Sequence, residues 1–281
     1  MEKFIVVTGA STGIGYDTCR LLIEQGYKVF GSVRKTADGE RIQAELGESF
    51  TPLLFDVTDH EAVKAAAEQV SLRIGGSGLF GLVNNAGIAV AGPLLEMSME
   101  DFKWQFEVNL FGLMAVTQAF APLLKTNERA DRPGRIVNLS SVSGQFSFPF
   151  FGAYAGSKYG VEAISDALRR ELMIYGIDVI VIGPGSVKTP IWDKRGGITE
   201  DKFKRSDYEP QIEMLETITQ QGNEDGMPVE RVSKTILTAL THPSPKTRYG
   251  LYNDLSQQLA RFLSARLMDR QIAKIFKFKI K

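Results

Sequence analysis

The sequence predicts an α/β fold, in which a doubly wound parallel sheet carries helices on both faces. Short apolar, β-branched runs alternate along the chain with longer segments of helical periodicity, as expected for strands joined by crossover helices. A glycine-rich turn separates the first strand from the first helix, which is typical of such sheets. No internal repeat or low-complexity linker divides the 281 residues, so residues 1–281 are interpreted as a single domain.

Six segments are predicted as buried strands, and a seventh is a weaker candidate. Their continuous apolar character indicates parallel strands that are covered on both faces. The strand segments are 3–7, 28–33, 50–55, 79–84, 134–140 and 177–182, with the weaker candidate at 247–252.

Helices are predicted in the gaps between these strands. Ser98 with Asp101 is expected to begin the fourth helix as a capping pair, and Gly26 and Gly176 are expected to end the first and the fifth. The helical segments are 14–25, 38–46, 59–71, 98–125 and 153–175.

The turn after the first strand, Thr8 to Gly15, has the spacing Gly-x-x-x-Gly-x-Gly. Its three glycines allow the backbone to turn tightly and to approach a pyrophosphate, while the following helix offers free amides to the phosphates. The alternative is a tight turn that binds nothing. Arg34 argues against that alternative, because it follows the second strand where a dinucleotide fold places the residue that meets the adenosine ribose.

Tyr154 and Lys158 are four residues apart, and on a helix this spacing places both side chains on one face. A free Tyr titrates near pH ~10 and is a poor acid–base catalyst at neutrality. A lysine cation beside it stabilises the phenolate and is expected to draw the pKa of the phenol down. The alternative for such a pair is a solvated helix face.

The glycine turn and the Tyr-x-x-x-Lys pair together resemble the short-chain dehydrogenase/reductase family. The resemblance runs from Lys3 to about Thr189, and the segment from Ser157 to Leu172 looks like the retinol and hydroxysteroid dehydrogenase branch. It implies a Rossmann fold, a nicotinamide cofactor and a catalytic set made of Asn109, Ser141, Tyr154 and Lys158. It also implies cofactor contacts at Gly9, Ser11, Thr12, Gly13, Ile14, Gly15, Arg34, Asp56, Val57, Asn85, Ala86, Gly87, Tyr154, Lys158, Pro184, Gly185, Val187 and Thr189.

Several of these residues also have a structural interpretation. Asn84 is expected to act at least partly as a buried amide that ties neighbouring strands together. Asn109 lies among apolar residues, where a polar side chain needs partners, so it either has a structural role or belongs to a catalytic relay. Ser140 competes with Ser141 for contact with the substrate, and the offset of 13 residues to Tyr154 favours Ser141.

The cofactor is expected to be NADP, with NAD as the alternative. Arg34 offers a planar fork of donors that suits a 2′-phosphate, and Lys35 and the hydroxyl of Ser11 could add to it. The alternative role for Arg34 is stacking on adenine. Asp56 is expected to meet adenine or else to cap the next helix, and a capping box at residues 58–61 would leave it free for adenine.

The substrate is expected to be an apolar alcohol or carbonyl compound. Four phenylalanines lie in the segment from Gly144 to Phe151. Because this segment lies between Ser141 and Tyr154, it is expected to border the reacting carbon. The rings form either an apolar substrate wall or a helix or subunit interface. The expected function is an NADP(H)-dependent oxidoreductase that interconverts an alcohol and its ketone or aldehyde. The alternatives are an NAD-linked sugar or acyl-ketone reductase and a non-catalytic dinucleotide sensor.

Composition narrows the function classes. Basic and acidic residues balance at 33 each, which argues against a nucleic-acid binder. Cys19 is the single cysteine, so a reducing compartment is expected, and His60 and His242 show no zinc-binding pattern, so no metal is expected. The first strand leaves no room for a signal peptide after Met1, and no apolar run approaches the ~20 residues of a membrane span. These features predict a cytoplasmic protein.

Two further segments stand outside the alternating pattern. Residues of about 190–226 are polar, and the family resemblance implies that they form a lid over the substrate. The C-terminal tail, about 255–281, is basic and partly amphipathic, and it either packs on the protein or contacts anionic lipid as a peripheral membrane segment. The resemblance also implies a homodimer or homotetramer formed through helices 98–125 and 153–175.

Overall fold

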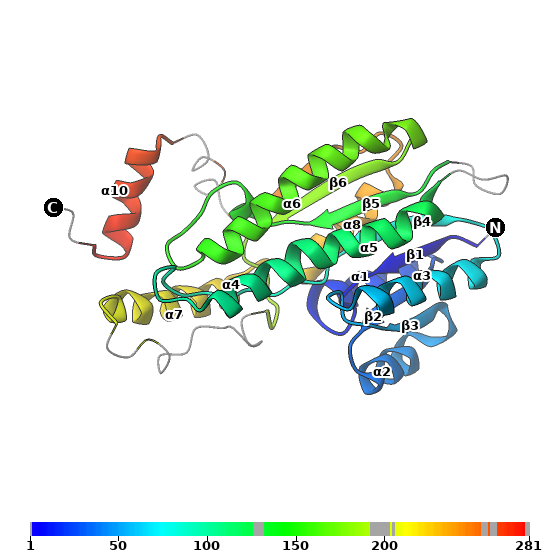
Figure 1. Cartoon of the computed structure of the whole chain (residues 1–281), viewed down its shortest axis with the longest axis horizontal. Helices are drawn as coiled ribbons and strands as arrows, with labels where there is room; N and C mark the ends of the chain where they lie inside the picture. Colours follow the sequence, from blue (N-terminus) through cyan, green and yellow to red (C-terminus); the bar gives the residue numbers. More distant parts are fainter. Residues whose placement is uncertain are drawn as a thin grey trace.

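A computed structural model describes residues 2–125, 132–191, 203, 206–253, 258 and 263–278. Its centre is one parallel sheet of seven strands in the order β3-β2-β1-β4-β5-β6-β7 (Figure 1). The predicted fold class and all seven predicted strands, including the weak seventh, are confirmed. The strands are β1 Phe4–Val7, β2 Lys28–Val33, β3 Phe50–Leu54, β4 Leu79–Asn84, β5 Arg135–Leu139, β6 Asp178–Pro184 and β7 Arg248–Leu251.

The five predicted helical segments are confirmed, although 98–125 is interrupted by a π-helical turn, and two further helices, α7 and α10, lie in the segments predicted as lid and tail. The sequence interpretation missed helix α8, Val229–Thr241. Its buried residues 232, 236, 239 and 240 follow the helical period, so the sequence did contain a signal for this helix. The helices are α1 Gly13–Glu24, α2 Thr36–Leu46, α3 His60–Ile74, α4 Met99–Phe106, α5 Gly112–Phe120, α6 Gly152–Glu171, α7 Glu209–Glu224, α8 Val229–Thr241 and α10 Ala265–Ile275.

The predicted helix ends are also confirmed. The Ser98 hydroxyl accepts a hydrogen bond from the Asp101 amide at 3.0 Å, which satisfies one free donor at the start of α4. Gly176 ends the turn after α6 in a left-handed conformation, with φ of 65°. That conformation suits glycine, and it redirects the chain into β6.

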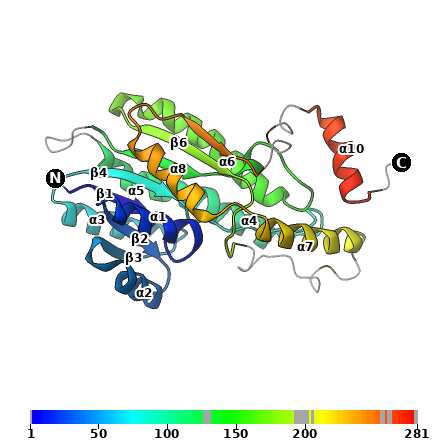
Figure 2. The same cartoon turned by 180° about the vertical axis from the view of Figure 1, so that it is seen from behind.

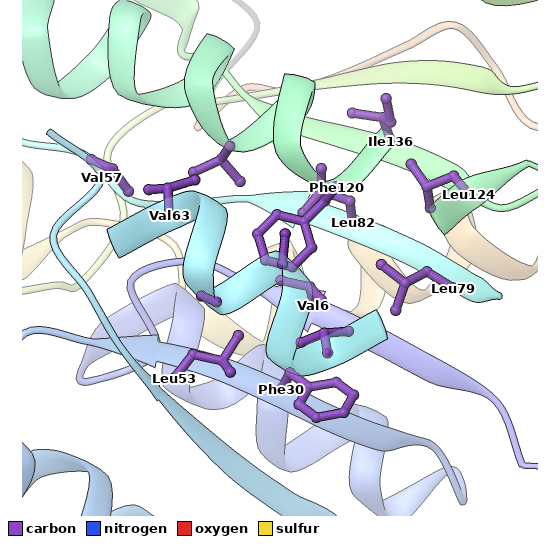
Figure 3. Close-up of a cluster of buried hydrophobic side chains, with 14 of the residues drawn as sticks. Val6, Phe30, Leu53, Val57, Val63, Leu79, Leu82, Phe120, Leu124 and Ile136 are labelled. Carbon is purple, nitrogen blue, oxygen red and sulfur yellow. The ribbon is translucent and has the colours of Figure 1, made fainter. Parts of the chain in front are cut away.

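Two apolar cores lie on opposite faces of the sheet. In the first core, Val6, Leu82 and Ile136 of three adjacent strands meet Val63 of α3 and Phe120 of α5 (Figure 3). Helices α1, α2 and α8 contribute to the core on the other face, and α1 and α8 lie in front of the sheet when the molecule is seen from behind (Figure 2). The sheet therefore has helices on both faces, as predicted for parallel strands.

Arg135, which begins β5, holds the missed helix α8 against the sheet. Its guanidinium is buried and donates hydrogen bonds to the carbonyls of Ala239, Leu240 and His242 at 3.1, 3.0 and 2.8 Å. These are carbonyls at the C-terminal end of α8, which carry partial negative charge and need donors. Gly81 of β4 leaves room for Leu240, since a Cβ there would lie 2.5 Å from the Leu240 side chain.

The run Met99–Leu124 corrects the expectation that no apolar segment reaches the length of a membrane span. Its 26 residues comprise α4, a π-helical turn at Glu107–Phe111, α5 and a short 3₁₀ turn, and they are long and apolar enough for a span. Half of the apolar window is buried inside the protein, where Val116 and Phe120 contribute to the core. Its apolar composition therefore has a structural explanation in core packing.

Candidate functional site

A cavity of about 530 Å³ lies at the carboxyl ends of the strands, above the point where the strand order reverses between β1 and β4. Ligands of open α/β sheets bind at such reversal points. Every site residue named from the sequence lines this cavity except Gly15 and Asn109. The two halves of the chain thus bring the glycine turn and the Tyr–Lys pair to one place.

The glycine turn is locked to the turn after β4. The Asn85 side chain donates hydrogen bonds to the carbonyls of Thr8 and Gly9 at 2.9 and 3.2 Å. Gly9 has a φ of 68°, and a Cβ there would lie 2.9 Å from the backbone of Ala86. Gly15 is needed for packing, since a Cβ on it would overlap the Gly9 carbonyl oxygen. These contacts hold the backbone in a cradle that side chains cannot fill, which suits a pyrophosphate.

Ser141, Tyr154 and Lys158 meet where β5 ends against α6. The side chain of Ser141 forms a hydrogen bond with that of Tyr154 and accepts one from the Ser143 amide at 3.1 Å. The Lys158 ammonium donates to the carbonyl of Leu139 at 2.8 Å and lies 5.8 Å from the centre of the Tyr154 ring. The contact with Tyr154 favours Ser141 over Ser140 for binding a substrate oxygen.

The electrostatics of this set differ from the expectation. Burial raises the pKa of Tyr154, and the hydrogen bond from Ser141 opposes that rise. Burial lowers the pKa of Lys158 from 10.5 to about 8, and the negative charge of Glu162 opposes that decrease. The expected decrease in the pKa of Tyr154 is therefore not seen, and Lys158 is not among the causes of the shift. Burial removes water from around the phenol and so disfavours its charged form. The Lys158 ammonium donates its hydrogen bond to a backbone carbonyl and not to the Tyr154 oxygen.

Asn109 acts on the loop after β4 and not on the cavity. Its side chain accepts from the Ile88 amide at 2.9 Å, and donates to the Ile88 carbonyl at 3.0 Å and to the Ser157 hydroxyl at 3.2 Å. It lies in the π-helical turn, a distortion that is frequent at functional sites. Gln105, one turn earlier, holds the same loop: its side chain accepts a hydrogen bond from the Val90 amide and donates one to the Ile88 carbonyl. The sequence interpretation missed Gln105, although its i, i+4 spacing places it on the same helix face as Asn109.

Two other polar residues of the predicted set are buried. Asn84 donates to Thr117 and Asn138 at 2.9 Å each, which confirms its expected role as an amide that ties strands together. Ser140 lines the cavity, and its buried hydroxyl has no hydrogen-bond partner within the described part of the chain.

The adenosine end of the cavity contains Arg34 and Asp56. The Arg34 guanidinium lies 3.7 Å from one carboxylate oxygen of Asp56. The other oxygen accepts hydrogen bonds from the amide and hydroxyl of Thr58 at 3.0 and 2.9 Å. Asp59 caps α3 through the Ala62 amide, so Asp56 is not the cap. This agrees with the expectation that Asp56 does not cap the helix, and its contact with adenine stays a prediction.

The loop before α6 and helix α7 contribute many of the apolar side chains of the cavity wall. Phe146, Phe148 and Phe151 line the cavity, as the substrate-wall interpretation expects. Phe150 is not among the lining residues and is buried behind the wall with Leu215 of α7 and Phe276. Phe148 and Phe151 both line the cavity and pack against this buried cluster, so the substrate-wall and intramolecular-contact interpretations apply together. Other apolar lining residues are Ile191, Leu215, Ile218 and Phe276.

The fold and the cavity define a nucleotide-binding α/β protein with a buried Ser–Tyr–Lys set. A family model described as short chain dehydrogenase matches residues 3–197. The chain belongs to this family, and it is an oxidoreductase that uses a nicotinamide dinucleotide.

Known relatives cover nearly the whole chain. The NADPH-dependent 3-dehydrocapnine reductase of Ornithobacterium rhinotracheale is 39% identical over 277 residues, which cover 98% of this chain and 96% of that protein. Retinol dehydrogenase 16 of Rattus norvegicus is 32% identical, over 89% of this chain and 80% of its own length. The crystal structure of a short-chain dehydrogenase from Streptomyces avermitilis has a TM-score of 0.79 and 26% identity, and covers 100% of this chain and 99% of its own. The expected similarity to retinol dehydrogenases is confirmed.

Replacing Lys158 by Met is expected to change how stability depends on pH. Because the pKa of Lys158 is lowered from 10.5 to about 8, the unfolded chain binds more protons than the folded chain between these values. Burial of the cation therefore lowers the unfolding free energy by its full amount below about pH 8. This penalty disappears as the pH rises towards 10.5. Relative to the variant, the wild-type protein should gain about 1 kcal/mol of unfolding free energy per pH unit in this window.

Urea denaturation of both proteins across this pH range measures the difference. Lys234→Met, which changes an exposed lysine of α8, is the control and should run parallel to the wild type. Parallel curves for the wild type and Lys158→Met would contradict the assignment.

Proposed function

We propose that this protein interconverts an alcohol and its ketone or aldehyde on a lipophilic substrate, with NADP(H) as the cofactor and Tyr154 as the general acid and base. The observation that carries this proposal is the position of Ser141, Tyr154 and Lys158 in the cavity. They line the same cavity as the glycine-rich turn and the phenylalanines of the loop before α6.

A nicotinamide cofactor supplies or accepts the hydride when bound. In the reductive direction, the Tyr154 hydroxyl gives its proton to the carbonyl oxygen of the substrate, and in the oxidative direction it takes the proton back. Ser141 holds the same oxygen through its hydroxyl. Lys158 would hold the nicotinamide ribose. Asn109 would act through the loop that it holds after β4, and would anchor a water that passes the proton towards Lys158 and solvent.

NADP is proposed over NAD because of the adenosine end. Arg34 is exposed and lies in the cavity wall with Lys35 and Ser11. Its guanidinium fork matches the geometry of a 2′-phosphate, which would compete with Asp56 for it. The 39%-identical relative is itself named as NADPH-dependent, which supports the same choice.

The alternatives have less support. A sugar reductase would need polar partners for several hydroxyl groups, whereas the substrate end is lined by phenylalanine, leucine and isoleucine side chains. A non-catalytic sensor needs no phenol placed beside a serine hydroxyl and a buried lysine. A panel of aliphatic, steroid, retinoid and sugar carbonyls, assayed by NADPH absorbance, separates these possibilities.

The proposal includes a lid of residues of about 190–226 over the substrate. The two ends of the segment lie side by side. The backbone amide of Lys188 donates to the Met227 carbonyl at 3.0 Å, and the Met227 amide donates to the Ser186 carbonyl at 2.9 Å. Leu215 of α7 lies in this segment and lines the cavity. Residues 192–202, 204 and 205 fall outside the described part. Slower proteolysis of the segment when NADPH is bound would support the lid, and an unchanged rate would argue against it.

The proposal also includes a homodimer or homotetramer through the run 99–124 and α6. Phe111 and Tyr159 are exposed on these helices, at 53% and 45%, which suits a covered face in an oligomer. Size-exclusion chromatography with light scattering tests this part, and a monomer would exclude it.

Replacing Tyr154 by Phe is expected to reduce kcat by ~10²–10⁴-fold. The ring remains and keeps its packing, but the transferable proton is lost, so NADPH should still bind. Turnover of the best panel substrate and NADPH fluorescence measure the two effects. Tyr159→Phe, an exposed tyrosine of the same helix, is the matched control and should stay near wild-type activity. A Tyr154→Phe enzyme that kept a tenth of the wild-type rate would refute the mechanism.

Replacing Arg34 by Gln is expected to lower kcat/KM for NADPH by about 10–150-fold, because a charge-assisted hydrogen bond contributes ~1.5–3 kcal/mol. Use of NADH should change little, since NADH lacks the 2′-phosphate. Steady-state kinetics with both cofactors measure this, with Arg170→Gln on the exposed side of α6 as the control. Equal specificity constants of the wild type for the two cofactors would overturn the assignment.

A cytoplasmic location with peripheral membrane contact through α10 is the last part of the proposal. Leu263, Leu267 and Ile275 are 41%, 41% and 45% exposed, beside a single acidic residue, Asp269. Apolar side chains among cations suit the surface of an anionic bilayer. The exposed cations of this part of the chain are Arg266, Arg270, Lys274 and Lys277.

Sedimentation with vesicles tests this contact. The wild type should sediment with vesicles that contain phosphatidylserine at low salt and be released at high salt, because screening weakens attraction between exposed charges. The double variant Arg270→Glu/Lys274→Glu should stay in solution. If the wild type does not sediment, the tail has only a packing role.

A further inference from the structure

Helix α10 is attached to the rest of the protein through one aromatic cluster. Within residues 263–278, only Ala273 and Phe276 are buried. The Phe276 ring packs edge-on against Phe150, with the ring centres 5.5 Å apart, and Leu215 of α7 completes the buried centre. The far end of the chain therefore contacts the loop before α6 and the proposed lid. Figure 1 shows α10 and α7 at the same end of the molecule, remote from the N-terminus.

The backbone at both sides of this contact is unusual. Phe150 and Lys277 have φ values of 68° and 53°, in the left-handed region that favours glycine. The Gly92 amide donates to the Phe150 carbonyl at 2.7 Å, and the Phe278 amide donates to the Ala273 carbonyl at 2.9 Å. The second bond ends α10 in a Schellman turn. It brings Phe278 back onto Phe276, with the ring centres 5.8 Å apart.

Phe276 also belongs to the wall of the cavity that contains Tyr154. It is 1% exposed, and it shares the wall with Phe151, Leu215 and Ile218. The C-terminal segment thus contributes a side chain to the wall of the same cavity that the glycine turn lines. A polar chain in this compartment would lose its hydrogen bonds to water, whereas a hydrocarbon chain would gain by leaving water.

We propose that α10 is part of the substrate site, and that Phe276 forms the terminal wall that selects substrates with a long apolar chain. This inference rests on the proposed function, because it concerns the substrate of the same cavity. A short carbonyl compound reaches Tyr154 without touching Phe276. A long aliphatic chain extends from Tyr154 past the phenylalanines and packs against Phe276.

Chain length is the variable that tests this role. With straight-chain 2-alkanones from butanone to dodecanone, the wild-type kcat/KM should rise with length. In Phe276→Ala the KM for dodecanone should increase about tenfold, since the loss of a matched apolar contact in a pocket costs roughly 10–200-fold in specificity. The kcat/KM for butanone and the Kd for NADPH should stay within about twofold, because neither contact involves Phe276.

Two further variants separate substrate selection from a loss of folding. Phe276→Trp keeps the aromatic contact but shortens the compartment, so it should also penalise dodecanone more than butanone. Gln271→Ala, at an exposed position of α10, should behave as wild type throughout. Equal losses for butanone and dodecanone in both Phe276 variants, or no loss in either, would overturn the proposal.

A binding measurement distinguishes this inference from the proposed function. Dodecanone, but not butanone, should raise the Tm of the wild type in the presence of NADPH, and Phe276→Ala should lose that shift. If no carbonyl is turned over but the shift depends on Phe276, the proposed reaction fails and the terminal wall stands. If carbonyls are reduced but neither the shift nor KM depends on Phe276, the reaction stands and the terminal wall fails.

Discussion

The hydrogen bond from the buried Lys158 ammonium to the carbonyl of Leu139 is the contact on which the proposed reaction geometry depends. It ties α6 to the end of β5. Ser141 lies two residues after Leu139, and Tyr154 lies one helical turn before Lys158, so this single tie brings the serine hydroxyl and the phenol together. The locked glycine turn then places the cofactor cradle beside them, because β1, β4 and β5 are neighbours in the sheet.

Burial of the Lys158 ammonium works against stability near neutral pH. Burial raises the pKa of Tyr154 and lowers the pKa of Lys158, so both charged forms are disfavoured in the folded protein. Glu162 offsets part of the cost for Lys158, and its own charge is held by Arg248 of β7 at 3.2 Å. Groups whose charge is disfavoured by burial persist mainly where their proton transfer is used, which supports the proposed reaction.

Distant parts of the chain line different parts of the cavity. One part comes from turns after β1, β2 and β4, all in the first third of the sequence, where the backbone itself forms the cradle. Many of the apolar lining residues come from the loop before α6, from α7 and from Phe276 near the C-terminus. In the proposed function, the first group recognises a cofactor that many enzymes share, and the second sets the choice of substrate.

The sequence alone determined the strands, most helices, the glycine cradle and the Tyr154–Lys158 face, because periodicity, caps and turn glycines act over a few neighbouring residues. Only the tertiary structure decided that the pKa of Tyr154 rises, that Asp56 already has neighbours and that Phe150 leaves the cavity wall. It also decided that Phe276 closes the cavity beside Leu215, which lies 61 positions earlier. Desolvation and packing depend on which distant segments cover a side chain, and no local pattern records that.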